Sequence, residues 1–363
     1  MKNEPHNIKR FALKDPEKIL YDNLYAKFGQ RFVDYRKRYE RNIQNLDFDK
    51  QTDYPNTVVM ELVNRCNLEC PFCKQWFRNE ANKTTLDDHI LDHIFDDFKK
   101  NKLNSLMISA SEPLLYKKLD KVLERAREAE IMDVFLFTNG VLLNEKNAKM
   151  ILDSCITRLF ISVDATSEEA YRKIRIPVAK RLLQEDRLKH LEENILRFMK
   201  LREEYNRELP LVRTSFLAFK ENKSQIQEFI SKWKGVVDSV EIQTNVVPSF
   251  KMNNGKEKET IDDWYKMLDD KRDTKNRIPN YTKKYSCREP WHQMSIYSDG
   301  TFVPCCAPFG RNIPIGNIKN EKIKEAWNGF NMKRLRDGFK KNKPNKVCKA
   351  CLDHTTRVTN DIF

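Results

Sequence analysis

Residues 66–73 have the sequence CNLECPFC and follow an apolar run at 57–63. The run has the length and the β-branched residues of a buried strand. The three thiolates of 66–73 can hold three irons of a 4Fe–4S cluster and leave the fourth iron to a non-protein ligand. A closed zinc site needs four ligands, commonly with a second pair a short distance along the chain, but the next cysteine is Cys155. The motif therefore favours an iron–sulfur cluster over zinc.

The composition favours a cytoplasmic protein. The chain has 363 residues, enough for two domains with an ample core. Its first residues, MKNEPH, lack the apolar segment of a signal peptide, and the sequence has no apolar run long enough for a membrane span. In the cytoplasm the nine cysteines are expected to be reduced. Clustered cysteines are then metal ligands rather than disulfides.

Positive charge is concentrated towards the C-terminus. The formal net charge is +14, and residues 319–349 contain eleven Lys or Arg but only three acidic residues. A patch of this kind fits nucleic acid, an anionic substrate or an acidic carrier. It fits a solvated surface around a metal site equally well, so charge alone does not choose a partner.

The order of apolar runs predicts an α/β protein. Residues 1–54 are expected to form a helical extension, because aromatic residues and leucines recur there at spacings of three and four. Short apolar runs then alternate with amphipathic stretches, the pattern of a parallel sheet with crossover helices. Six such units predict a partial, TIM-like (β/α)6 barrel at 55–248, followed by a linker at 249–285. The expected strands are 57–63, 105–109, 133–138, 158–163, 211–218 and 236–243.

Polar residues follow several of these strands. In sheets of this class the chemistry gathers at the carboxyl ends of the strands. The cysteine loop follows the first strand, Glu112 the second, Asn139 the third, and Ser162 with Asp164 the fourth. We expect these groups to converge on one rim and to anchor a polar cofactor. Turn residues can follow any strand, and for the Thr-Asn-Gly sequence around Asn139 alone a simple turn is the preferred interpretation.

The region 286–363 contains a second group of cysteines. Two alternating runs flank residues 298–300, whose sequence SDG predicts a β-hairpin. A helix is expected from 322 to about 339, and a C-x2-C pair follows it. Together these segments predict a four-thiol site for either a second 4Fe–4S cluster or structural zinc. Its ligands would be Cys287, Cys305, Cys348 and Cys351.

Three other residues could belong to these sites or to the core. Cys306 adjoins Cys305 and could replace it as a ligand. Cys155 lies beside an apolar run and is expected to be a core residue. His292 lies in the predicted hairpin, next to the second cysteine site, and is the one candidate for a catalytic residue. Most histidines in such positions are structural.

The motif at 66–73 resembles that of the radical S-adenosylmethionine (radical SAM) superfamily. The resemblance implies that Cys66, Cys70 and Cys73 hold a 4Fe–4S cluster whose open iron takes the amino and carboxylate groups of the cofactor's methionine part. At the second strand the family has Gly-Gly-Glu-Pro, whereas this chain has ASEP at 110–113 and lacks both glycines. The resemblance implies cofactor contacts at Phe72, Ser111, Glu112, Asn139, Ser162 and Asp164. It gives weaker support to two further contacts on the last two strands, Ser215 and Gln243.

The C-terminal cysteines resemble the SPASM/Twitch extension of radical SAM enzymes. The spacing of Cys287, Gly300 and Cys305 and the late C-x2-C carry the resemblance, together with GNI at 316–318 and AWN at 326–328. A full extension continues with three more cysteines, and none follows Cys351 here. The resemblance therefore implies the shorter form with a single auxiliary cluster, and the glycine spacing favours Cys305 over Cys306.

The resemblance implies a radical oxidoreductase. A reduced first cluster would cleave S-adenosylmethionine to a 5′-deoxyadenosyl radical, which abstracts hydrogen from a C–H bond. The auxiliary cluster would accept the second electron, and a reduced flavodoxin- or ferredoxin-type protein would supply electrons. The leading hypothesis is oxidation of a polar small molecule such as a sugar, an aminocyclitol or a nucleotide sugar.

Two alternatives remain open on the sequence. The first is modification of a peptide, as SPASM maturases perform. The second is a non-enzymatic, basic zinc-binding RNA protein that uses residues 287–351. We do not expect a nucleic acid partner, and the iron content of the protein would separate these classes.

Overall fold

A ten-stranded sheet runs through the computed structural model, which describes residues 8–44, 51–73, 84–180, 186–218, 222–244, 285–349 and 351–352. The strand order is β1-β7-β6-β5-β4-β3-β2-β8-β9-β10. The strands are β1 Ile8–Phe11, β2 Thr57–Met60, β3 Ser105–Ile108, β4 Asp133–Thr138, β5 Arg158–Ser162, β6 Leu211–Ala218, β7 Ser239–Thr244, β8 Gln293–Ile296, β9 Thr301–Val303 and β10 Gly316–Asn317.

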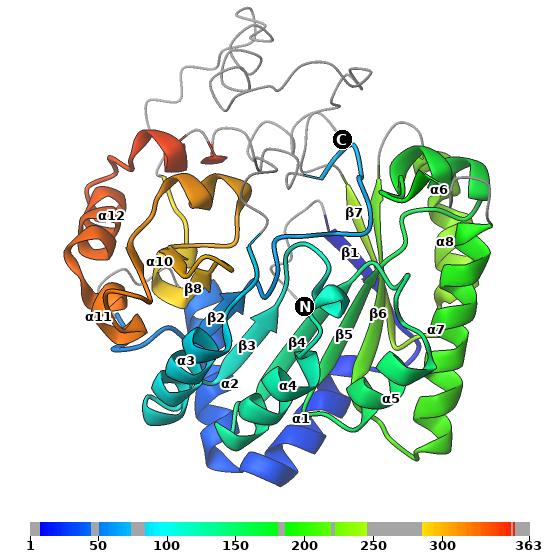
Figure 1. The fold of residues 1–363 in the computed structure, drawn as a ribbon, viewed down its shortest axis with the longest axis horizontal. Coiled ribbons are helices and arrows are strands. Elements are labelled where there is room, and N and C mark those ends of the chain that lie inside the picture. Colours follow the sequence, from blue (N-terminus) through cyan, green and yellow to red (C-terminus); the bar gives the residue numbers. More distant parts are fainter. Residues whose placement is uncertain are drawn as a thin grey trace, which may run out of the picture.

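Strands β2 to β7 form the predicted open barrel. They are all parallel and pair in chain order, from β2–β3 to β6–β7. The outer strands of this set pair with other segments instead of with each other: β7 pairs with β1, and β2 pairs with β8. The barrel therefore stays open (Figure 1), which confirms the α/β class and the partial (β/α)6 architecture.

Crossover helices cover the outer face of these strands (Figure 1). They are α3 Asp88–Lys100, α4 Leu119–Glu128, α5 Glu145–Leu152, α6 Glu168–Ile174, α7 Arg187–Glu204 and α8 Ile226–Trp233. Their apolar side chains and those of the strands form one buried cluster, in which Leu91 and Ile94 of α3 join Ile108 of β3. Burying a side chain of this size contributes about 1.5–3 kcal/mol. Packing of this kind determines which face of the strands points towards the helices.

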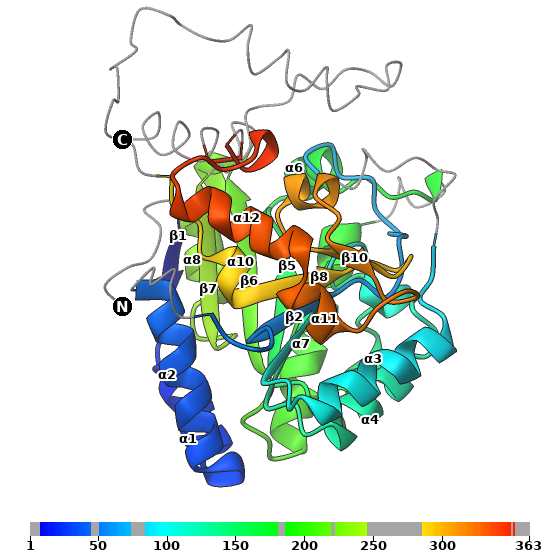
Figure 2. The same ribbon diagram turned by 90° about the vertical axis from the view of Figure 1, so that its left-hand side faces the viewer.

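Two further helices, α1 (Pro16–Phe28) and α2 (Gln30–Gln44), pack on the other side of the strands. Figure 2 shows α1 and α2 on one side and α3 and α4 on the other. Tyr35 of α2 donates a hydrogen bond to Asp133, the first residue of β4, at 3.1 Å. The helices thus close the amino end of the barrel. Their buried cluster consists of Leu20, Leu24, Phe32, Tyr35, Met132 and Leu211.

The N-terminal region is not wholly helical, and the prediction of a helical extension at 1–54 is wrong for β1. This strand pairs antiparallel with β7 and places Arg10 opposite Glu241. Its sequence, IKRF, is short and charged, so it carries no strand pattern of its own. The edge of a strand far along the chain supplies the hydrogen-bonding partners that make it a strand.

The predicted helix at 322–339 is two helices, α11 (Ile323–Asn328) and α12 (Phe330–Lys340). Gly329 separates them in an extended conformation, with a ψ angle of 171°. A Cβ atom at Gly329 would lie 2.9 Å from the carbonyl oxygen of Glu325. The chain therefore turns at a position where a larger residue would clash with the end of α11.

The C-terminal region continues the barrel sheet. Strand β8 is parallel to β2, and β9 is antiparallel to β8. A short helix, α10 (Glu289–His292), precedes β8 where the alternating pattern predicted a strand, because Pro290 suits the first turn of a helix. The predicted linker 249–285 lies outside the described residues except for Tyr285. No helix of the described ranges is long and apolar enough to cross a membrane.

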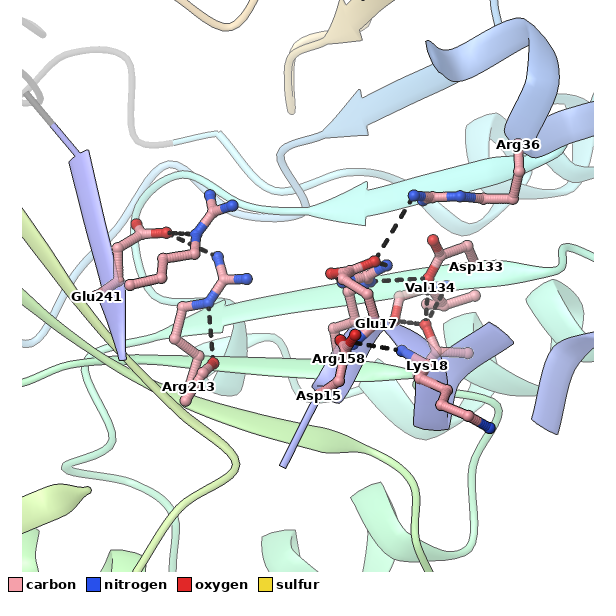
Figure 3. Close-up of polar contacts among 12 residues, drawn as sticks. Asp15, Glu17, Lys18, Arg36, Asp133, Val134, Arg158, Arg213 and Glu241 are labelled. Atoms are coloured by element: carbon pink, nitrogen blue, oxygen red, sulfur yellow. Dashed lines mark hydrogen bonds and ion pairs between the residues drawn. The ribbon is translucent and has the colours of Figure 1, made fainter. Parts of the chain in front are cut away.

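An ion pair anchors α1 to the inner face of the barrel. Arg158 of β5 donates from both terminal nitrogens to Glu17 of α1, at 2.6 and 3.1 Å (Figure 3). Its Nε lies 3.4 Å from Asp133, and its side chain is only 6% exposed. Burial alone would raise the pKa of Glu17, but Arg158 and Arg36 bring it to about 2. The ionised pair therefore ties the N-terminal helices to the sheet.

We expect Glu17→Gln to lower the free energy of unfolding by about 1–2 kcal/mol, because it leaves the buried Arg158 with one carboxylate. The loss stays below that of a fully buried pair since Glu17 is 48% exposed. Asp22→Asn is the matched control, because it removes the exposed pair with Lys18 and should cost less than about 0.5 kcal/mol. Denaturant unfolding compares the two variants. Equal losses would contradict an anchoring role for Glu17.

Candidate active site

The cysteine loop 66–73 follows β2 and is held by backbone hydrogen bonds. The N–H of Cys73 donates to the carbonyl of Cys70 at 2.9 Å and closes a turn. Two further bonds, of 2.6 and 3.1 Å, join the loop to segment 176–178, which follows α6. The loop is thus fixed between the end of β2 and the connection that leaves β5.

The thiols of this loop are shielded from water and receive N–H donors. Burial raises the pKa of Cys66 to about 12 and that of Cys70 to about 11. Nδ2 of Asn139 donates to Sγ of Cys66 at 3.6 Å, and Nη1 of Arg175 donates to Sγ of Cys70 at 3.7 Å. A metal replaces the proton of such a thiol when it binds. The donor set therefore fits an iron–sulfur cluster.

Glu112 connects the strand ends around the loop and is fully buried. Its carboxylate accepts hydrogen bonds from the Asn139 N–H and the Thr138 hydroxyl, both at 2.8 Å. It also accepts the Leu114 N–H at 3.1 Å, while its own N–H donates to the carbonyl of Arg65. Burial raises the pKa of Glu112. Within the described residues Glu112 forms no ion pair, so its three donors, with the charge of Arg175, hold the carboxylate in place.

The two residues before Glu112 keep a backbone conformation that glycine favours. The φ angle is +72° at Ala110 and +53° at Ser111. Residues with a Cβ atom pay about 1–2 kcal/mol in this region. The chain therefore keeps a glycine-type turn at the second strand although both glycines of the family motif are replaced.

Asn139 belongs to a turn that the surrounding residues hold rigidly. A Cβ atom at the neighbouring Gly140, whose φ angle is +72°, would lie 2.5 Å from Leu191. Asn194 of α7 donates to the carbonyl of Gly140 at 3.0 Å. The segment is thus a turn, as its sequence predicts, and its geometry directs the Asn139 side chain to Cys66. The same segment is therefore both a turn and a hydrogen-bond donor to the cysteine loop.

Arg175 is a site residue that sequence reasoning missed. It is 8% exposed, donates to Oδ2 of Asp164 as well as to Cys70, and lies 5.3 Å above the ring of Phe72. Burial would lower the pKa of Arg175, but Asp164 and Cys70 raise it, so the side chain is a cation. Its Nε has no partner in the part of the chain that the structure describes. An arginine that follows a helix is not part of a recognisable site motif in the sequence, because only the fold brings it close to the thiols.

The remaining predicted cofactor contacts lie on β5, β6 and β7. Ser162 and Ser215 are register partners and are half-buried on the inner face. Gln243 donates to Oε1 of Glu241 at 2.6 Å. Asp164, with a φ angle of +67°, is enclosed by protein: Arg175 and the N–H of Leu217 bind its carboxylate. The structure therefore leaves Ser162 and Ser215 open towards a ligand and gives Asp164 partners within the protein.

The second group of cysteines gathers around Cys287. Burial raises the pKa of Cys287 to about 12, and the nearby thiols of Cys348 and Cys351 contribute. Cys287 in turn contributes to the raised pKa of Cys305, after burial and the adjacent Cys306. No three Cys, His, Asp or Glu side chains of the described ranges lie close enough to hold a single metal ion. The mutual effects of these thiols on their pKa values indicate that they lie near one another.

His292 and Cys155 lie apart from the cysteine loop. His292 is 5% exposed and packs on Tyr39, with ring centroids 4.9 Å apart. Its Nε2 lies 3.4 Å from Oγ1 of Thr57, the first residue of β2, whereas the cysteine loop follows the last. Burial lowers the pKa of His292 to about 3, so the ring is neutral. Cys155 packs partly buried against the main core.

Two family models match the sequence. The model of the radical SAM superfamily matches residues 60–232, and the SPASM model, an iron–sulfur cluster-binding domain, matches residues 287–352. The chain is a radical SAM protein with a C-terminal SPASM domain. Its cofactors are S-adenosylmethionine, the 4Fe–4S cluster that binds it, and an auxiliary iron–sulfur cluster. The thiols of Cys66 and Cys70, which receive N–H donors, and the cationic Arg175 fit these groups.

Solved structures share the fold of this radical SAM protein. SuiB from Streptococcus suis, bound to S-adenosylmethionine, has a TM-score of 0.56 and 16% identity, over 83% of this chain and 72% of SuiB. The protein anSMEcpe with bound AdoMet has a TM-score of 0.53 and 15% identity, over 85% of this chain and 95% of that chain. At these identities the likeness shows the fold alone.

Curated relatives match a shorter part of the chain. A probable GTP 3',8-cyclase from Methanococcus maripaludis is 31% identical over 117 residues, which are 32% of this chain and 39% of that protein. The GTP 3',8-cyclase of Aquifex aeolicus is 28% identical over 130 residues, 35% of this chain and 40% of that protein. The chain thus matches about two-fifths of the length of each of these relatives.

We expect Asn139→Ala to lower the reduction potential of the first cluster, because its N–H donor to Cys66 stabilises the more negative, reduced state. A hydrogen bond of about 1 kcal/mol corresponds to roughly 40 mV for one electron. A redox titration followed by electron paramagnetic resonance measures the shift. Asn144→Ala, which removes the N-cap of α5 where the Asn144 side chain accepts the Asn147 N–H, should leave the potential unchanged. The same shift in both variants would contradict the role of Asn139.

We expect Ala110→Gly and Ser111→Gly each to raise the free energy of unfolding by about 0.5–1 kcal/mol. Removing the Cβ atom relieves the left-handed strain, and the larger entropy of the unfolded glycine offsets part of the gain. Lys146→Gly, an exposed position in α5, should instead lose about 1 kcal/mol. Denaturant unfolding of the cluster-loaded protein checks the signs, and losses at all three positions would refute the strain at 110 and 111.

Proposed function

We propose that this radical SAM protein oxidises a polar substrate by removing one of its hydrogen atoms. When the cofactors are bound, the reduced first cluster cleaves S-adenosylmethionine to a 5′-deoxyadenosyl radical, and the auxiliary cluster accepts the second electron. One observation carries the proposal: the thiols of Cys66 and Cys70 receive N–H donors from Asn139 and Arg175, and the fully buried carboxylate of Glu112 lies near enough to Cys66 to affect its pKa. Such a site binds a metal cluster and a cationic ligand together.

The chain's own residues would bind and orient the cofactor at this rim. The buried negative charge of Glu112 would favour the ammonium of the methionine part, and the positive charge of Arg175 would favour the carboxylate. The inner-face hydroxyls of Ser162 and Ser215 are placed for the ribose. The cluster ligands would be Cys66, Cys70 and Cys73, and the remaining proposed contacts are the backbone of Phe72 with Ser111, Asn139, Asp164 and Gln243.

The substrate would enter from the cysteine rim. Helices α1 and α2 close the amino end of the barrel through the cluster around Phe32 and Tyr35. The half-buried inner-face side chains lie at the other end, on Ser162, Ser215 and Gln243. This arrangement would place the substrate between the closed end and the cofactor and exclude water from beneath it.

The auxiliary site suits electron transfer rather than substrate binding. Its proposed ligands, Cys287, Cys305, Cys348 and Cys351, would leave no iron open. A cluster of this kind can take an electron from a substrate radical without touching it. We propose a sugar, an aminocyclitol or a nucleotide sugar as the substrate, and a reduced flavodoxin- or ferredoxin-type protein as the electron donor.

A peptide is the second candidate substrate. The fold matches SuiB in its complex with the precursor peptide SuiA, with a TM-score of 0.56. It also matches anSMEcpe with AdoMet and the Cp18Cys peptide, with a TM-score of 0.51. These likenesses support the peptide and the small molecule equally, because an open barrel rim can admit either.

We expect Cys70→Ala to abolish formation of 5′-deoxyadenosine when the anaerobically reconstituted protein is reduced with dithionite in the presence of S-adenosylmethionine. The variant should keep about four of roughly eight irons, those of the auxiliary cluster. Cys155→Ala is the matched control and should keep both the activity and the iron, because Cys155 packs partly buried against the core. Continued cleavage in Cys70→Ala, or bound zinc with little iron in the natural chain, would reject the proposal.

A further inference from the structure

The inner face of the barrel carries a buried cation beyond the cofactor rim. Arg213 of β6 is 9% exposed, and its guanidinium carbon lies 4.1 Å from the ring centroid of Phe160 on β5. Nη1 donates to Oε2 of Glu241 at 2.9 Å, and Nε lies 3.4 Å from the hydroxyl of Ser239 (Figure 3). These contacts hold the plane of the guanidinium in one orientation.

One terminal nitrogen of this guanidinium, Nη2, takes no part in these contacts. Among the described residues, Nη2 of Arg213 has no hydrogen-bond partner. It is also absent from the fully enclosed polar atoms of the described residues that lack a partner, so protein does not enclose it completely. The hydroxyls of Ser162 and Ser215 likewise have no hydrogen bond within the described ranges, and both are half-buried. A donor arm and two hydroxyls therefore share one accessible face.

Arg213 shares its carboxylate partner with a second arginine. Oε2 of Glu241 also accepts Nε of Arg10 at 2.6 Å, so two guanidiniums share one carboxylate oxygen. The other oxygen of Glu241 binds Gln243. Burial lowers the pKa of Arg213 to about 10, against the opposing effect of Glu241, and Arg10 lowers it further. Arg213 therefore stays charged near neutral pH and shares the carboxylate of Glu241 with a second arginine.

The position of Arg213 relative to the cofactor rim defines what it could hold. Arg213 precedes Ser215 by two residues on β6, so both point to the same face and lie about 6.6 Å apart along the strand. Ser215 pairs with Ser162 in register, the row proposed for the ribose. Arg213 is thus one layer deeper than the cofactor, towards the closed end of the barrel. A substrate between these layers would meet Nη2 directly.

We propose that the inner face around Arg213 is an anion-binding subsite that holds a carboxylate or phosphate group of the substrate. This inference rests on the proposed function and narrows the substrate to an anionic one. The Phe160 ring and Glu241 orient the guanidinium, and Nη2 with the adjacent hydroxyls provides the donors that a planar or tetrahedral oxyanion accepts.

The test measures binding of simple anions to the full-length, cluster-loaded protein without reductant. Inorganic phosphate and acetate are titrated at constant ionic strength, and the thermal unfolding midpoint gives an apparent dissociation constant for each. We expect saturable stabilisation by at least one anion: phosphate alone indicates a phosphate group, and acetate alone a carboxylate. Arg213→Lys should raise that dissociation constant at least tenfold, because lysine can keep the ion pair with Glu241 but has no second arm.

Arg202→Lys is the matched control. Arg202 also binds a carboxylate with both arms, at 2.5 and 3.1 Å from Asp238, and its replacement should leave the dissociation constant unchanged within twofold. A second measurement uses the natural chain and so does not depend on the folding of a variant. The bound anion should slow the modification of Arg213 by phenylglyoxal, which mass spectrometry measures. It should not slow the modification of Arg202. Stabilisation that does not saturate, equal constants in the two variants, or no protection of Arg213 would overturn the subsite. Failure of 5′-deoxyadenosine formation would instead reject the proposed function and leave this result unaffected.

Discussion

The buried carboxylate of Glu112 is the contact on which the geometry of the site depends. It accepts donors from the turn after β3 and from the turn after β4, and its own N–H holds the residue before Cys66. A buried carboxylate that lost these donors would cost several kcal/mol, so both turns are held in place. Asn139, which donates to Cys66, is positioned by one of them. The cysteine loop and the cofactor wall are therefore one hydrogen-bonded unit.

The two faces of the sheet have separate tasks. The outer face packs apolar side chains against helices, while the inner face carries charged residues in pairs and triplets (Figure 3). Arg158 is neutralised by Glu17 and Asp133 and serves to attach α1. Arg213 shares its carboxylate with Arg10 and keeps one arm free. An arginine thus attaches α1 at one layer of the barrel, and another arginine offers a contact for a ligand at the next layer.

The sequence predicted most of the barrel, because each parallel strand contains a short run rich in apolar residues that pack against the outer helices. Strands 133–138 and 211–218 have the predicted bounds, while the last barrel strand begins at Ser239 instead of 236. Its first residues lie in a turn that apolar composition does not reveal. Strand β1 and the break at Gly329 were missed for a related reason: a partner strand far along the chain makes the first, and steric contact with Glu325 makes the second.

The sequence by itself determined the cofactor class, since three cysteines at 66–73 and four later ones restrict the metal chemistry through their ligand type and spacing. Tertiary structure alone decided which side chains surround the thiols. Arg175 reaches Cys70, Ala110 and Ser111 take left-handed angles, and Nη2 of Arg213 has no hydrogen-bond partner among the described residues. Each of these depends on neighbours that are distant in the chain. Residue type fixes what a ligand can bind, but only packing fixes where a donor points.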